Sequence, residues 1–261
     1  MQRIAADGPV RIEADESGDE VWRVVLDAPK ANIIDLAMIK ALTRVFDRAA
    51  ETKELKALLI EGEGKHFSFG ASVEEHLPDK VPEMLPEFHR MFQAALDASV
   101  VLLAAVRGQC LGGGLELASF CHRVFASPDA RLGQPEIVLG VFAPMASFLL
   151  TERVGRGNAE DLCLSGRILS AEDARSIGLV DEVHEDPGAA ALAWATEQLL
   201  PRSASSLRFA VQALRNGFER RFREEVRELE GLYLGGLMAS KDAEEGIRAF
   251  VEKRQPAWRN E

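Results

Sequence analysis

The apolar positions in the first part of the chain recur in patterns that predict alternating strands and helices. Residues 10–15 and 21–27 are predicted to be the two strands of a hairpin, joined by a polar turn at 16–19. Apolar residues then recur at helical spacing over 34–51, and the run 55–61 predicts a buried strand. This succession of strand and helix is typical of an α/β protein.

A glycine-containing loop is expected at residues 64–76, after the buried strand. Prolines 78, 82 and 86 predict an irregular connection, followed by a helix over 87–98. A proline-rich stretch beside such a loop is a candidate for the mobile wall of a pocket. Two loop histidines, His66 and His76, are interpreted as solvated or structurally hydrogen-bonded side chains rather than as bases or metal ligands.

The second part of the chain becomes increasingly helical. The run 100–106 predicts a buried strand and 179–184 a further strand, and the predicted helices cover 113–120, 144–154, 157–164, 170–177, 187–200, 203–217, 219–239 and 241–252. We therefore expect an α/β core over residues 1–185, with a C-terminal helical region over residues 186–261.

Composition and charge narrow the possible partners. Of 261 residues, 47% are hydrophobic and 28% are charged, which is typical of a soluble globular protein. The net charge of −11 argues against general binding to nucleic acid or to an anionic membrane. No apolar run approaches the roughly 20 residues that a membrane-spanning helix requires. With this negative net charge, a polyphosphate ligand would need a local cluster of basic residues.

The three cysteines, Cys110, Cys121 and Cys163, indicate neither disulfides nor a metal site. Their number is odd, they form no C-x-x-C motif, and no secretory signal opens the sequence, so a reducing cytoplasm is the expected location. Each lies among apolar neighbours and is expected to pack as a small hydrophobic residue. No metal site is predicted.

Candidate chemistry is concentrated between residues 107 and 136. Three consecutive glycines, Gly112 to Gly114, lie between a predicted strand and a short predicted helix that carries Glu116 in its first turn, and Glu136 follows a proline. Taken singly, these could be a tight connection, a helix cap and a solvated carboxylate. Taken together, free N–H groups at a helix start and two carboxylates suit proton transfer beside a carbonyl whose oxygen gains charge.

These features resemble the crotonase (enoyl-CoA hydratase/isomerase) superfamily. The matching residues are Gly70-Ala71, Gly108, Gly112 to Gly114, Glu116, the segment 133–136, Leu139-Gly140, LSGRILSAEDARSIGLVDEV at 164–183 and AFVEKRQPAW at 249–258. The resemblance covers almost the whole chain. It implies a spiral of repeated ββα turns, followed by helices that mediate assembly into a homotrimer or a homohexamer.

The resemblance also implies catalytic roles. The backbone N–H groups of Ala71 and Gly113 would form the oxyanion hole for a thioester carbonyl, and Glu116 and Glu136 match the two catalytic acids of the hydratases. Isomerases and decarboxylases of the superfamily commonly lack one of this pair, so a hydratase is expected. Coenzyme A would enter as part of an acyl-CoA substrate, and no separate cofactor is expected.

Contacts with CoA are implied less directly. Lys30 and Ala31 match a loop that wraps the CoA, and Lys253 matches a tail lysine that can reach a phosphate, although both lysines could equally be ordinary exposed charges. The remaining candidates for substrate contact are Phe69, Ser72, Val73, Gly112 and Met145.

Two departures from the family pattern bear on the acyl group. Ser72 stands where many relatives have Asp, and the segment 141–148 replaces a Gly-rich stretch, so that bulky side chains would border the acyl pocket: Phe142, Pro144, Met145 and Phe148. The segment FGASVEEHLP and the glutamate pair look like those of hydratases that act on a cyclic dienoyl-CoA in anaerobic aromatic degradation. The alternatives are a hydratase of short linear enoyl-CoA, an acyl-CoA hydrolase or isomerase, and a non-catalytic CoA-binding scaffold.

Overall fold

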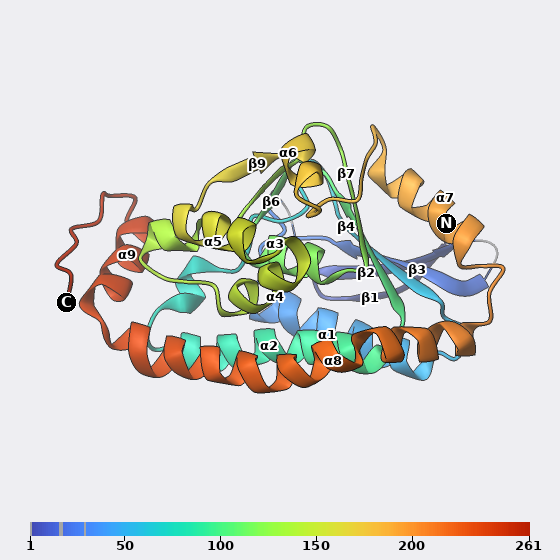
Figure 1. Ribbon diagram of the computed structural model, residues 1–261, viewed down its shortest axis with the longest axis horizontal. Coiled ribbons are helices and arrows are strands. Elements are labelled where there is room, and N and C mark those ends of the chain that lie inside the picture. Colours follow the sequence, from blue (N-terminus) through green and yellow to red (C-terminus); the bar gives the residue numbers. More distant parts are fainter. Residues whose placement is uncertain (1, 16–17, 29) are drawn as a thin grey trace.

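The computed structural model describes residues 2–15, 18–28 and 30–261, which form a mixed α/β fold (Figure 1). The strands are β1 Gln2–Asp7, β2 Val10–Asp15, β3 Gly18–Leu26, β4 Ala57–Gly62, β5 Val101–Val106, β6 Gln109–Leu111, β7 Arg123–Ala126, β8 Arg131–Gly133, β9 Ile168–Ser170 and β10 Glu182–Val183. The α-helices are α1 Leu36–Glu51, α2 Val81–Ala98, α3 Gly113–Phe120, α4 Pro144–Val154, α5 Arg156–Ser165, α6 Ala171–Ser176, α7 Pro187–Gln198, α8 Ala204–Gly231 and α9 Lys241–Val251.

The main sheet has the strand order β1-β2-β3-β4-β5-β7-β10. The first three strands pair antiparallel, and from β3 onward each neighbouring pair is parallel. Helices cover both faces of the parallel part: alternate residues such as Leu58 and Ile60 face the larger hydrophobic core, while Ala57 and Leu59 face a second core against α7. Burial on both faces explains why these strands are continuous apolar runs.

A second, smaller sheet has the strand order β6-β8-β9. The chain passes from β5 into β6 through Gly108, whose φ of +53° favours glycine. A bridge between Ser68 and Cys110 places the loop after β4 beside β6, and a second bridge joins Ile34 to Ala71. The loop that carries Ala71 and the glycine run that starts α3 are thereby brought together.

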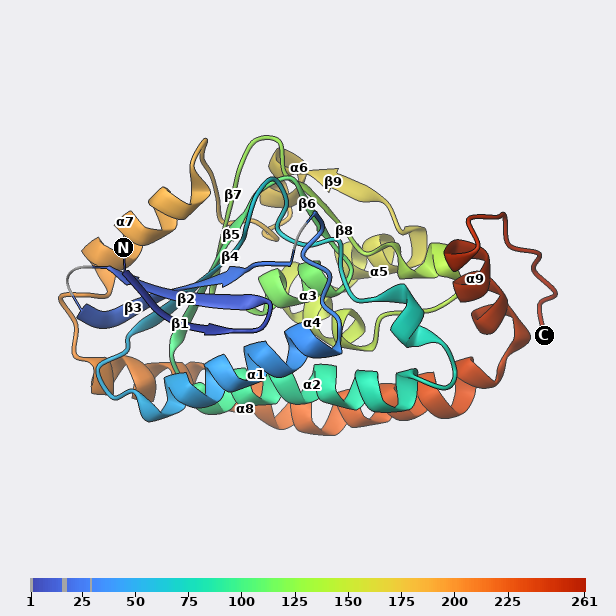
Figure 2. The ribbon, with the colours of Figure 1, turned by 180° about the vertical axis from the view of Figure 1, so that it is seen from behind.

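Helices α1, α2 and α8 form one layer on one side of the main sheet, and α3 and α4 lie on the same side, next to this layer (Figures 1 and 2). Helix α7 covers the opposite face of the sheet. Helix α1 begins at a cap in which Asp35 accepts the Met38 N–H at 2.8 Å. Aromatic side chains from α2, α3 and α8 pack in a row, including Phe92, Phe120 and Phe218. Within the described residues, no helix is both long and apolar enough to cross a bilayer.

The structure confirms most of the predicted helices and the strands predicted at 10–15, 21–27, 55–61 and 100–106, and it corrects other predictions. Strands β1, β6, β7, β8 and β9 were not predicted, and the strand expected at 179–184 is reduced to β10. The irregular connection expected through residue 86 ends earlier, because α2 begins at Val81: Pro82 lies in the first turn, which lacks N–H partners, and Pro86 is accommodated within the helix. Of the hairpin turn predicted at 16–19, residues 16 and 17 lie outside the described residues.

A further correction concerns the C-terminal helices. The two helices predicted at 203–217 and 219–239 are one helix, α8, that continues into a π-helical segment Leu232–Gly236 and a 3₁₀ turn Leu237–Ala239. Gly217 does not interrupt α8, since a glycine inside a helix costs only about 1 kcal/mol and Phe218, Phe222 and Val226 bury one face of it. The division into regions 1–185 and 186–261 stays a prediction.

Candidate active site

The glycine run at the start of α3 allows three close approaches, each with a different neighbour. Gly112 has a φ of +51°, and a Cβ there would lie 2.4 Å from Glu136 Oε1. A Cβ on Gly113 would lie 3.1 Å from the Ala71 nitrogen, and one on Gly114 would lie 2.7 Å from the Ser68 Cβ. The run therefore makes room for a carboxylate, a backbone amide and a packed side chain.

Glu116 projects from the first turn of α3 into the interior, where only 4% of its surface is exposed. Its Oε1 accepts a hydrogen bond of 2.7 Å from the Ala146 N–H, in the first turn of α4. The N-terminus of a helix favours negative charge, so this contact fixes the carboxylate and partly offsets its burial. The carboxylate is thus held between two helix starts.

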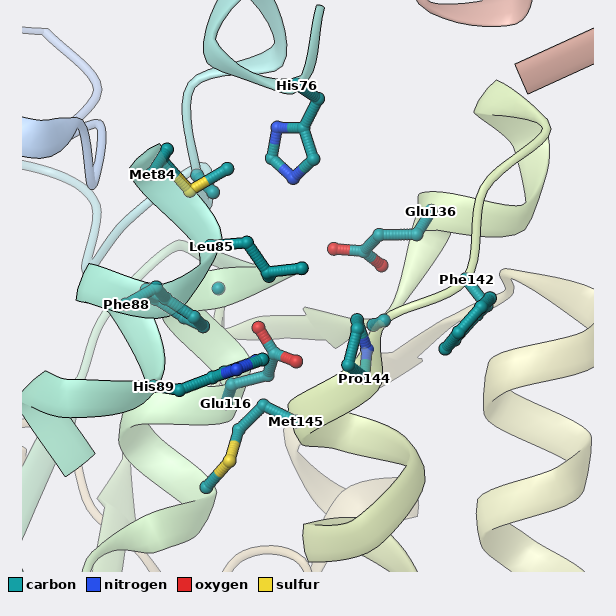
Figure 3. Close-up of a pocket in the computed structure, with 13 residues that line it drawn as sticks. His76, Met84, Leu85, Phe88, His89, Glu116, Glu136, Phe142, Pro144 and Met145 are labelled. Carbon is teal, nitrogen blue, oxygen red and sulfur yellow. The ribbon is translucent and has the colours of Figure 1, made fainter. Parts of the chain in front are cut away.

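Glu136 comes from a 3₁₀ segment, Pro135–Leu139, that follows β8. The segment is held beside the glycine run because the Gly112 N–H donates to the Gly133 carbonyl at 3.0 Å. Both Glu116 and Glu136 line one cavity, into which their carboxylates point (Figure 3). The cavity volume of about 20 Å³ is room for a single water molecule.

Burial shifts both carboxyl groups toward the protonated form. Desolvation, and after it the negative charge of Glu136, raises the pKa of Glu116 to about 8, against the smaller opposing effect of the Ala146 N–H. Desolvation raises the pKa of Glu136 to about 7. Because the two charges repel, the pair retains a proton near neutral pH. One carboxyl can then act as an acid while the other acts as a base.

The predicted oxyanion donors lie side by side at the edge of the same cavity, which both Ala71 and Gly113 line. Gly113 is the first residue of α3, where an N–H has no partner within the helix. The neighbouring bridge uses the Gly70 carbonyl and the Ser72 N–H, and among the described residues the Ala71 N–H donates to no other group. Two N–H groups are thus available for a carbonyl oxygen that gains charge.

The remaining wall of the cavity is mostly apolar. Met84, Leu85 and Phe88 come from α2, and Phe142, Pro144 and Met145 come from the start of α4 and the segment before it (Figure 3). Three of the four bulky residues expected at the acyl pocket therefore line it. Phe148 does not: it packs against Phe218 and Phe222 of α8 in the core, because it lies one helical turn beyond Pro144 and faces α8.

The predicted CoA contacts lie outside this cavity. Lys30 and Lys253 are exposed and have positive φ values of 78° and 56°, and Phe69 is 42% exposed, with its N–H donating to the Ala31 carbonyl at 3.0 Å. Ser72 and Val73 are partly buried and adjoin Ala71. Lys253 lies just beyond α9, and its role toward CoA stays a prediction.

Two histidines complete the cavity wall, and neither was assigned to it from the sequence. His76 Nδ1 lies 2.8 Å from the Ser72 carbonyl oxygen, as expected for a structurally bonded side chain, yet the ring also lines the cavity. His89 comes from α2 and lies beside Glu116. In the sequence, His89 stands between Phe88 and Arg90, and the pattern indicates only that it lies on the buried face of an amphipathic helix. Its neighbours do not indicate a functional role.

Comparison with known proteins places this geometry in a family. The sequence pattern of the enoyl-CoA hydratase/isomerase family matches residues 16–261. The chain is 49% identical over 255 residues to a cyclohexa-1,5-dienecarbonyl-CoA hydratase of Thauera aromatica, covering 98% of each chain. It is 32% identical to a probable enoyl-CoA hydratase of Bacillus subtilis, over 89% of this chain and 93% of that protein.

Solved structures agree with the sequence comparisons. An enoyl-CoA hydratase/isomerase from Pseudoalteromonas atlantica superposes with a TM-score of 0.84 and 27% identity, covering 96% of this chain and 99% of that one. The crotonase-type fold expected from the sequence is thereby confirmed. With its two carboxylates and paired N–H groups around one cavity, the chain belongs to the enoyl-CoA hydratase/isomerase family.

Proposed function

We propose that this protein hydrates a cyclic dienoyl-CoA, converting cyclohexa-1,5-diene-1-carbonyl-CoA to 6-hydroxycyclohex-1-ene-1-carbonyl-CoA. The observation that carries the hydratase assignment is the pair Glu116 and Glu136, which face one cavity beside two unpaired backbone N–H groups. The cyclic substrate is supported by 49% identity over nearly the full length to a protein of that name from Thauera aromatica. The bulky apolar side chains at 142–145 suit a flat ring.

The reaction is a 1,4-addition in which each group has a definite task. A carboxylate removes a proton from water, and the water oxygen bonds to ring carbon C2, which is β to the thioester. The electron pair of the C1=C2 bond moves onto the thioester oxygen, where the N–H groups of Ala71 and Gly113 stabilise it. The resulting dienolate takes a proton at C5, and the remaining double bond forms between C1 and C6, which become C1 and C2 of the product.

The raised pKa values suit this chemistry. Near neutral pH the pair Glu116 and Glu136 retains one proton, so a single enzyme form offers both a carboxylate base and a carboxylic acid. Each such acid–base group contributes typically about 10²- to 10⁴-fold to the rate. The cavity holds about one water molecule, so a ring can enter only if flexible wall residues such as Met84 and Met145 move.

We also propose how the enzyme binds CoA and how its subunits assemble. Coenzyme A is bound as part of the substrate and no separate cofactor takes part. We expect Lys30, Ala31, Phe69 and Lys253 to contact the CoA chain; Lys30, Phe69 and Lys253 are exposed, and Ala31 is half-buried. A homotrimer or homohexamer in the cytoplasm is the expected assembly, and sedimentation of the purified protein would measure it.

The substrate is tested by comparing kcat/KM for the cyclic 1,5-dienoyl-CoA with kcat/KM for crotonyl-CoA, with products identified by mass. We expect a clear preference for the cyclic thioester, and a loss of at least about 10²-fold on it in Glu116→Gln and in Glu136→Gln. A preference for crotonyl-CoA would reassign the protein as a short-chain enoyl-CoA hydratase. CoA binding without turnover of any enoyl-CoA would instead indicate a non-catalytic scaffold.

A further inference from the structure

A third acid–base group shares the cavity with the two glutamates. His89 on α2 is only 6% exposed, and its Nδ1 lies 2.7 Å from Glu230 Oε2 on α8. The other ring nitrogen, Nε2, is buried and has no hydrogen-bond partner among the described residues. Figure 3 shows the imidazole beside the Glu116 carboxylate, at the opposite side of the cavity from His76.

The contact with Glu230 determines what His89 can do. A carboxylate can only accept, so the Nδ1 that faces it carries the proton. The carboxylate then stabilises the imidazolium that forms whenever Nε2 also takes up a proton, as in other His–carboxylate pairs of acid–base enzymes. Leaving a buried polar atom without a partner destabilises the folded protein. An orphaned Nε2 at a cavity wall is therefore positioned for a ligand rather than for the protein itself.

The proposed reaction needs an acid at a place where ordinary hydration needs none. Adding water to a linear enoyl thioester puts the oxygen on the β-carbon and the proton on the adjacent α-carbon, both within reach of one pair of carboxyl groups. In the 1,4-addition the oxygen goes to C2 and the proton goes to C5, at opposite corners of the ring. A proton donor displaced from the glutamate pair along the cavity wall would meet this requirement.

We propose that His89, held by Glu230, delivers the proton to C5 of the ring, an inference that rests on the proposed cyclic substrate. Glu136 takes a proton from water as the oxygen bonds to C2, and the dienolate takes the Nε2 proton of the His89 imidazolium as the C1=C6 bond forms. Glu136 is then protonated and His89 neutral. A proton passed from Glu136 through Glu116 to Nε2 restores both groups, so no other reactant is needed.

In this assignment His89 is a catalytic residue and Glu230 a positioning residue. Glu230 lies on α8, which contacts α2, and it holds His89 in place without lining the cavity itself. A purely structural His89 would affect every substrate alike. Loss of a donor to C5 would affect turnover of the cyclic substrate far more than turnover of the linear one, and this difference makes the two roles separable.

The test compares His89→Gln with the wild type on the cyclic 1,5-dienoyl-CoA and on crotonyl-CoA. Gln fills most of the same space and can still hydrogen-bond Glu230, but it cannot transfer a proton. We expect kcat for the cyclic substrate to fall about 10²- to 10⁴-fold, and to fall far more than kcat for crotonyl-CoA does. His89→Asn provides a second variant if His89→Gln does not fold.

A second readout follows the proton itself. When the cyclic diene is hydrated in D₂O, the wild type should place deuterium on one face of the ring carbon derived from C5, whereas residual turnover by His89→Gln should place it on both faces. Glu230→Gln should lower kcat for the cyclic substrate without changing KM, and Glu230→Asp should recover part of the loss. His184→Gln is the matched control, because His184 and Glu182 form an exposed pair of similar geometry, with 2.8 Å between Nε2 and Oε2.

The possible outcomes separate this inference from the proposed function. If the wild type does not hydrate the cyclic diene, the proposed function fails and the role of His89 fails with it. If the wild type hydrates the cyclic diene, the proposed function stands. The role of His89 is then refuted by any one of three results for His89→Gln: a kcat near that of the wild type, an equal loss of kcat on both substrates, or deuterium addition to one face only.

Discussion

Replacing Glu116 by Gln should make the fold more stable while it removes activity. Glu116 is buried and carries a pKa of about 8 instead of its ordinary 4.5, so the folded protein binds a proton there more tightly than the unfolded chain does. Stability from such a group is fully present below pH 4.5 and is lost as the pH rises through 8. Gln resembles the protonated acid at every pH, and its oxygen can still accept the Ala146 N–H.

The magnitude follows from the difference between the two pKa values. At about 1.4 kcal/mol per pKa unit, the ionisable Glu116 costs the folded state about 4 kcal/mol at pH 8 and about 1 kcal/mol at pH 5. Glu116→Gln should raise the free energy of unfolding by these amounts. For a chain of this size, about 1 kcal/mol corresponds to roughly 2 °C in melting temperature. We therefore expect Tm to rise by about 8 °C at pH 8 and by about 2 °C at pH 5.

The assay is thermal or denaturant unfolding of wild type and variant at both pH values, at one protein concentration, because assembly also contributes to apparent stability. The arm at pH 5 serves as the internal control, since the acid is mostly protonated there in the folded state. An equal gain at the two pH values, or a lower Tm of the variant at pH 8, would refute the reasoning that Glu116 is held at a cost to stability for the sake of catalysis.

The other predictions concern the oxyanion hole, the second carboxylate and the CoA. Gly112→Ala should displace the Glu136 carboxylate, because the added Cβ would lie 2.4 Å from Oε1. We expect kcat to fall on the order of 10²-fold, while the affinity for CoA, measured by calorimetry, is unchanged. Gly113→Ala should crowd the Ala71 N–H, at 3.1 Å from the new Cβ, and lower kcat about 10²- to 10³-fold; normal turnover by the folded variant would remove this N–H from the mechanism. Lys253→Ala should raise KM for CoA thioesters but not for a pantetheine thioester, which lacks the phosphate, and an equal change for both would indicate lost packing.

The sequence by itself determined the local elements around the site. Strand 100–106, helix 113–120 and helix 144–154 were all predicted, because apolar periodicity, glycines and a proline at a helix start are properties of neighbouring residues. The family motifs also identified Glu116 and Glu136 as a pair. Their meeting in one cavity could be expected only through the resemblance, since the two residues come from different segments.

Only the tertiary structure decided which distant groups surround those carboxylates. The Ala146 N–H reaches Glu116 across 30 residues of sequence, and Glu230 reaches His89 across 141. No local pattern encodes such contacts, because they depend on how helices α2, α4 and α8 pack. The same packing keeps α8 continuous through Gly217 and buries the Phe148 side chain in the core. The raised pKa of each carboxyl follows from its burial, and that of Glu116 follows also from the charge of Glu136; both are properties of the folded chain alone.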